Sequence, residues 1–281
     1  MEKNLKTLLR EHGMQLKKAY GQNFLTDNLL LEEIVEKAGV TKDDVILEIG
    51  CGAGALTRVL AKKAKKLVGY EIDKDLQPVL KETLAEFNNV EINFQDVMKQ
   101  DLVEIEKKLG EKYLLVANLP YYITTPIVMR FIENSSNIKG MVIMVQEEVA
   151  DRFSAKPGTS DYGAITVGIN LRGRSEKVLR VGREKFTPPP NVDSAVVKIT
   201  IDENKCSDYD FKKVRNVVRC AFSSRRKMLV NNLMNGFKLS RTASEIVLEK
   251  TGISLTVRGE NLSELEYVRL AKSLEEYGVD L

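Results

Sequence analysis

An apolar run that leads into three alternating glycines constrains the fold of this chain more than any other feature. The run is Val45–Ile49, and Gly50, Gly52 and Gly54 follow it directly. Alternating glycines let a backbone turn sharply and approach a ligand closely. A buried strand, a glycine-rich turn and a helix in succession are typical of a nucleotide-binding unit, although this spacing differs from the G-x-G-x-x-G of dinucleotide sites.

Apolar runs and amphipathic stretches alternate before and after this turn. The amphipathic stretches predict helices at 27–39, 56–64, 74–87, 101–109, 125–134 and 146–154. The apolar runs predict strands at 45–49, 67–72, 90–94, 113–117 and 140–145, with later strands at 162–171 and 192–201. This alternation predicts an α/β fold with a parallel, doubly wound, Rossmann-like sheet.

The pattern changes to helices alone after residues 202–205. The helical candidates are 208–222, 224–236, 241–250 and 261–277. We therefore predict a flexible basic leader at residues 1–20, an α/β domain at 21–203 and a small all-α domain at 208–281.

Composition excludes several classes of protein. The chain has 281 residues, one histidine (His12) and three scattered cysteines (Cys51, Cys206 and Cys220). No cysteine pair has the spacing of a metal or redox site, so no metal is expected, and His12 lies in the N-terminal leader, which disfavours a hydrolase with a histidine base. No apolar run approaches the ~18–20 residues that span a bilayer, and no apolar signal segment is found, so we expect no membrane association and a cytoplasmic location.

Basic residues are concentrated in three places, although the net charge is only +3. One group lies in the leader, one between Arg172 and Lys185, and one between Lys205 and Lys227, which includes Arg225, Arg226 and Lys227. Each group alone could be the solvated face of a helix. Together, local basic surfaces on a nearly neutral chain favour a polyanion such as nucleic acid as the partner.

Polar side chains are predicted at the ends of successive strands. Glu71 is placed to accept hydrogen bonds from ribose hydroxyls, and Asp96 from an adenine amine. Asn118-Leu119-Pro120-Tyr121-Tyr122 offers an amide oxygen and an aromatic face to a flat heterocycle with an exocyclic amine, or it is simply a proline turn that leaves the sheet. A nucleoside without a pyrophosphate, such as S-adenosylmethionine, suits these acids best.

Four separated motifs resemble the ribosomal RNA adenine N6-dimethyltransferases. They are Gly21–Leu25, Glu48–Gly54, Asn118–Tyr121 and Phe186–Val197. Two further segments, Ala221–Lys227 and Arg258–Leu262, resemble the C-terminal domain of the small-subunit branch of that family. Members commonly have proline where this chain has Cys51.

The resemblance implies a Rossmann-like methyltransferase that uses S-adenosyl-L-methionine and releases S-adenosyl-L-homocysteine. Its substrate would be two adjacent adenosines in the 3′-terminal hairpin of 16S rRNA within an immature 30S-type particle, and we expect a monomer. The cofactor residues would be Asn23, Leu25, Gly50, Gly52, Glu71, Asp96 and Asn118.

The same resemblance suggests how the adenine amine would be held. The Asn118 side chain and the Pro120 carbonyl would accept its two N–H groups, Tyr121 would stack on the base and Phe186 would close the opposite face. Arg225, Arg226 and Lys227 would bind rRNA phosphates. No strong general base is required.

Three other functions are consistent with parts of this pattern. A 23S rRNA adenine methyltransferase of the antibiotic-resistance type would share the catalytic half, but the two C-terminal segments disfavour it. A non-catalytic rRNA-binding assembly factor would not need Asn118, Glu71 and Asp96. A nicotinamide dehydrogenase is disfavoured by the glycine spacing and the lack of a catalytic histidine.

Overall fold

The computed structural model describes residues 10–13, 23–206 and 208–281, so most of the predicted leader lies outside the described residues. Contacts along the chain group its residues into two compact units. The first comprises the described part of Met1–Ala150 with Glu176–Thr200, and the second comprises Asp151–Ser175 with the described part of Ile201–Leu281. Residues 151–175 thus belong to the second unit by contact, whereas the predicted limits place them in the first. The division into folding domains at 21–203 and 208–281 stays a prediction.

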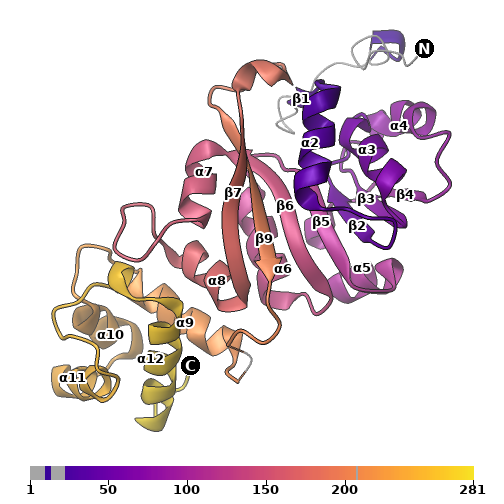
Figure 1. Ribbon diagram of the computed structural model, residues 1–281. Helices are drawn as coiled ribbons and strands as arrows, with labels where there is room; N and C mark the ends of the chain where they lie inside the picture. The colour runs from indigo at the N-terminus through magenta and orange to yellow at the C-terminus, as the bar shows by residue number, and fades with distance from the viewer. Residues whose placement is uncertain (1–9, 14–22, 207) are drawn as a thin grey trace. The chain divides into compact units, whose positions relative to one another are not determined.

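A seven-stranded sheet forms the centre of the first unit, in the order β4-β3-β2-β5-β6-β9-β7 (Figure 1). Pairing is parallel from β4 to β6, and β9 is antiparallel to β6. The strands are β2 (Val45–Ile49), β3 (Lys66–Tyr70), β4 (Val90–Asn93), β5 (Tyr113–Asn118), β6 (Ile138–Gln146), β7 (Gly173–Val181) and β9 (Ser194–Ile201). This order differs from that of dinucleotide-binding sheets because β9 is inserted between β6 and β7.

Helices precede, connect and follow the parallel strands and lie on both faces of the sheet (Figure 1). They are α2 (Asn28–Ala38), α3 (Ala55–Lys63), α4 (Gln77–Thr83), α5 (Leu102–Leu109), α6 (Thr124–Asn134) and α7 (Glu147–Phe153). Local signals fix their ends, as in α2, where Asp27 accepts a hydrogen bond from the Leu30 amide and Gly39 ends the helix in the left-handed region. The predicted α/β class is confirmed.

One predicted strand is wrong. Residues Ala164–Arg172 form helix α8, and strand β7, which sequence analysis missed, follows it. The β-branched residues of this segment favour a strand, but Ile165, Val167, Ile169 and Leu171 are all buried, so the segment is apolar on every side. Periodicity alone cannot separate a helix buried all round from a buried strand.

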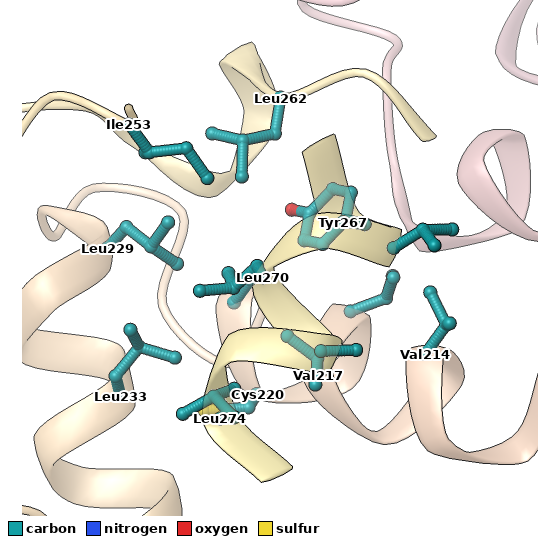
Figure 2. Close-up of a cluster of buried hydrophobic side chains, with 14 of the residues drawn as sticks. Val214, Val217, Cys220, Leu229, Leu233, Ile253, Leu262, Tyr267, Leu270 and Leu274 are labelled. Carbon is teal, nitrogen blue, oxygen red and sulfur yellow. The ribbon is translucent and has the colours of Figure 1, made fainter. Parts of the chain in front are cut away.

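The second unit contains α8 and the four helices predicted near the C-terminus. They are α9 (Phe211–Ala221), α10 (Leu229–Phe237), α11 (Arg241–Lys250) and α12 (Glu264–Glu276). Figure 2 shows Leu270 and Leu274 of α12 lying between Val217 of α9 and Leu229 and Leu233 of α10. Within the described residues, no helix is both long and apolar enough to cross a membrane.

Candidate active site

A cavity lies at the carboxyl ends of β2, β3 and β5, which are neighbours in the sheet. Open α/β sheets place their ligands at this edge. The structure brings nine of the predicted site residues together here. These lining residues are Asn23, Leu25, Gly50, Gly52, Glu71, Asp96, Asn118, Pro120 and Tyr121.

The glycine turn is held against the end of β3 by two hydrogen bonds. Gly50 and Gly52 both have left-handed backbones, with φ of 77° and 57°. The Gly50 amide donates to the Tyr70 carbonyl at 2.8 Å, and the Gly52 amide donates to Glu71 Oε2 at 2.8 Å. A Cβ on Gly52 would come within 3.0 Å of the Phe24 ring. Glycine is therefore required both by conformation and by space.

Cys51 occupies the middle of this turn and is 5% exposed. Its thiol lies 3.9 Å from the Tyr70 carbonyl, and a Cβ on Gly69 would approach its sulfur to 2.5 Å. Burial raises the pKa of this thiol well above its usual value. The side chain is thus a neutral group packed against β3 rather than a reactive thiolate.

The Glu71 carboxylate is held by two backbone hydrogen bonds. Its Oε1 accepts a hydrogen bond from the Asp73 amide at 2.8 Å, and its Oε2 accepts the bond from Gly52. Burial raises its pKa, while these backbone hydrogen bonds act in the opposite direction. Because each carboxylate oxygen has more than one lone pair, both can still accept from a ligand hydroxyl.

Asp96 begins a short 3-10 turn, where its Oδ1 accepts a hydrogen bond from the Met98 amide at 3.0 Å. Its other oxygen lies 3.9 Å from the Lys99 ammonium, a long ion pair at the surface. Ile72 and Val97 also line the cavity between Glu71 and Asp96. This part of the cavity therefore combines apolar surface with two carboxylates, which suits a nucleoside.

Asn118 is the last residue of β5, as predicted. Its Nδ2 donates to the Asn23 carbonyl at 3.4 Å, which leaves Oδ1 as the acceptor available to a ligand. The carbonyl of Pro120 already accepts two hydrogen bonds, from the Ile123 amide at 3.1 Å and from Thr124 Oγ1 at 3.2 Å. A substrate amine would have to displace one of them, so the role assigned to Pro120 stays a prediction.

The two adjacent tyrosines have different surroundings. The Tyr121 hydroxyl lies 2.7 Å from Ser194 Oγ, and burial raises the pKa of this tyrosine. Tyr122 also lines the cavity but is 61% exposed.

Phe186 does not line the cavity. It is 4% exposed and packs into the hydrophobic core of the first unit. It belongs to the short strand β8 (Phe186–Thr187), which pairs with β1 (Phe24–Leu25) so that Leu25 and Phe186 face each other in register. The pairing joins two of the sequence motifs, but the role of Phe186 in closing on a base stays a prediction.

Sequence analysis missed Glu48 as a site residue. Glu48 lines the cavity, is 1% exposed, and its Oε2 has no hydrogen-bond partner among the described residues. Burial, with a smaller contribution from the charge of Glu71, raises its pKa to about 8. A single acid inside the apolar run Val45–Ile49 was the signal that could have identified it.

The second unit carries the predicted RNA-binding residues on the loop between α9 and α10. All three are exposed. Arg225 is bound to Glu260, with Nη2 at 2.9 Å and Nε at 3.0 Å from the same oxygen. Arg226 and Lys227 form no ion pair with any described residue. In the first unit, by contrast, Lys177 and Arg180 both pair with Glu147.

No group of three or more metal-ligating side chains is found in the part of the chain that the structure describes. Known structures resemble the chain over most of its length. A dimethyladenosine transferase from Plasmodium falciparum superposes with a TM-score of 0.80 at 28% identity, covering 91% of this chain and 98% of that one. The 23S rRNA methyltransferase ErmE gives a TM-score of 0.69 at 27% identity, covering 90% and 100%.

These likenesses, the sheet order and the acids at successive strand ends define a Rossmann-like methyltransferase. The sequence profile described as ribosomal RNA adenine dimethylase matches residues 13–276. The Ribosomal RNA small subunit methyltransferase A of Geobacillus thermodenitrificans (strain NG80-2) is 44% identical over 276 residues, which cover 96% of this chain and 94% of that protein. The chain belongs to the ribosomal RNA adenine dimethylase family, as its motifs predicted, and is an enzyme of that family.

Proposed function

We propose that this enzyme transfers methyl groups from S-adenosylmethionine to the N6 amines of two adjacent adenosines in the 3′-terminal hairpin of 16S rRNA. The observation that carries the proposal is the position of Asn118, whose Oδ1 is available in a cavity that also presents Glu71 and Asp96. The similarity to the Geobacillus relative, a ribosomal RNA small subunit methyltransferase, supports the small subunit as the substrate.

The cavity fits the proposed methyl donor. Glu71, which lies beside the glycine turn, would accept from the ribose hydroxyls, and Asp96 would accept from the adenine amine. Ile72 and Val97 give apolar surface for the ring between these acids. When bound, S-adenosylmethionine supplies an electrophilic methyl group on a sulfonium and leaves as S-adenosylhomocysteine.

The residues at the end of β5 would orient the adenine amine. Asn118 Oδ1 would accept one N–H, and the Pro120 carbonyl would accept the other in place of one of the bonds that it accepts from Ile123 and Thr124. Two acceptors on one nitrogen localise its lone pair. Holding this nitrogen in line with the methyl group of the donor would supply much of the rate. After one transfer a single N–H remains, which still permits a second. Tyr121 would stack on the extruded base.

The second unit would hold the rRNA. Arg226 and Lys227 are exposed and without ion-pair partners among the described residues, so they can bind phosphates, whereas Arg225 is engaged by Glu260. Phosphate contacts set affinity without reading sequence. We propose a cytoplasmic monomer that acts on an immature 30S-type particle.

Replacing both Arg226 and Lys227 with alanine should weaken binding to small subunits and make the negative slope of log K against log salt shallower by about 2, because each phosphate contact contributes roughly −0.9 to it. Binding is measured by filter retention from low to high salt. The matched control is Arg241→Ala with Lys250→Ala, since both cations already pair with glutamates in the same unit. An equal change of slope in both variants would contradict the assignment.

The proposed function is tested by incubating the protein with methyl-labelled S-adenosylmethionine and either small or large ribosomal subunits that lack the modification. We expect label only in the small subunit, and N6,N6-dimethyladenosine at two adjacent positions after digestion. Label in the large subunit would instead support the antibiotic-resistance type of activity. Binding without label in either subunit would support a non-catalytic assembly factor.

A further inference from the structure

The hydroxyl of Tyr121 has a specific partner far away in the sequence. Ser194 Oγ lies 2.7 Å from it, and Ser194 is fully buried. Ser194 is the first residue of β9 and pairs with Gln146 of β6, the strand next to β5. We propose that Ser194 is a positioning residue that fixes the ring of Tyr121 for stacking on the target base; this inference rests on the proposed function.

The sheet makes Ser194 a rigid anchor. Its strand is hydrogen-bonded to β6, and the residue before it is held at two points, because the Asp193 carbonyl accepts from the Glu147 amide at 3.0 Å and the Asp193 carboxylate accepts from the Arg183 amide at 3.1 Å. An anchor of this kind can hold a side chain on a turn in one orientation.

Tyr121 lies on a turn, and its side chain can leave the backbone in more than one χ1 rotamer, so the backbone alone does not fix the direction of the ring axis. The turn itself is fixed on the Pro120 side by the bonds from Ile123 and Thr124. The bond to Ser194 fixes the far end of the ring, so the ring is held at both ends before any base arrives.

This geometry also limits what Tyr121 can do chemically. Its hydroxyl is engaged by Ser194, and burial keeps it protonated at neutral pH because its pKa is raised. The residue therefore contributes the face of its ring and not a base. Preorganisation of that face lowers the entropy cost of ordering the base in the transition state.

The test compares Ser194→Ala, Tyr121→Phe and the double variant in the subunit methylation assay. One lost hydrogen bond is worth about 0.5–1.5 kcal/mol, so each single change should lower kcat by roughly twofold to 13-fold with the affinity for S-adenosylmethionine unchanged. Because both changes remove the same bond, the double variant should lose no more than the worse single variant.

The chain offers a matched control in the same unit. Tyr113, at the opposite end of β5, pairs with Ser135, whose Oγ lies 3.0 Å from the tyrosine hydroxyl, and neither residue lines the cavity. Ser135 Oγ also donates to Glu106 and accepts from the Ile138 amide, so its loss costs more bonds than the loss of Ser194 Oγ from the Tyr121 pair. Ser135→Ala should lower the unfolding temperature but leave kcat unchanged.

Three results would overturn the positioning role: wild-type kcat in Ser194→Ala, multiplicative losses in the double variant, or an equal loss of kcat in Ser135→Ala. The wild-type protein is assayed in parallel. Absence of methyl transfer by the wild type would count against the proposed function itself. Separately, calorimetric binding of S-adenosylmethionine by each variant shows that the variant is folded.

Discussion

Asn118→Ala should lower kcat/KM for methylation of small subunits by roughly 30-fold to 1000-fold. This range corresponds to about 2–4 kcal/mol of transition-state stabilisation, the loss typical of removing one preorganised polar group. The alanine variant removes the Oδ1 acceptor and also the hydrogen bond from Nδ2 to the Asn23 carbonyl. The loss should therefore appear mainly in kcat, with a smaller loss of donor affinity.

The measurement is single-turnover methyl transfer with saturating S-adenosylmethionine. The matched control is Asn89→Ala, because Asn89 donates to the carbonyls of Ala61 and Ala64 and does not line the cavity. That variant should lose stability and keep its rate once folded. Near-wild-type turnover by Asn118→Ala would show that this amide does not serve the reacting amine.

The strand-end residues could be placed from the sequence because parallel strands bring their carboxyl ends to one edge of a sheet. Glu71, Asp96 and Asn118 follow three different strands, so recognising the strands was sufficient to bring these side chains together. The same rule identified the glycine turn as part of the cavity. Short motifs were therefore enough to predict which residues gather at this cavity, although they are distant in sequence.

The remaining details depend on contacts between distant segments, which no local pattern encodes. Phe186 pairs with Leu25 and packs in the core, a contact that its motif does not show, and its role in closing on a base stays a prediction. The Pro120 carbonyl is engaged by the helix that follows it, and Ser194 reaches Tyr121 across the sheet. Helix α8 was mistaken for a strand because its burial on all sides removed the periodic signal.

Glu48 is the buried acid whose titration should be visible in the stability of the protein. Its pKa is raised to about 8 in the folded state, mainly by burial, against an ordinary value of 4.5. Between these values the folded protein holds a proton that the unfolded chain has lost. The free energy of unfolding therefore falls as pH rises, and the contribution of Glu48 is lost as pH passes through about 8.

Glu48→Gln should remove this pH dependence. Glutamine keeps the shape of the side chain but cannot ionise, so the variant should gain roughly 1–4 kcal/mol of stability relative to wild type between pH 5 and pH 8. Urea unfolding at both pH values measures the difference. The control is Glu86→Gln at an exposed acid, which should shift neither curve. Parallel pH profiles for wild type and Glu48→Gln would contradict the assignment.

The position of Glu48 links this titration to the proposed function. It lines the same cavity as Glu71 and Asp96, and its Oε2 has no partner among the described residues. A cationic ligand in the cavity favours the ionised form of a nearby carboxyl, so its binding should release a proton at neutral pH. We therefore expect the affinity for S-adenosylmethionine to rise between pH 6 and pH 8 in the wild type. In Glu48→Gln it should stay flat, because no proton is left to release.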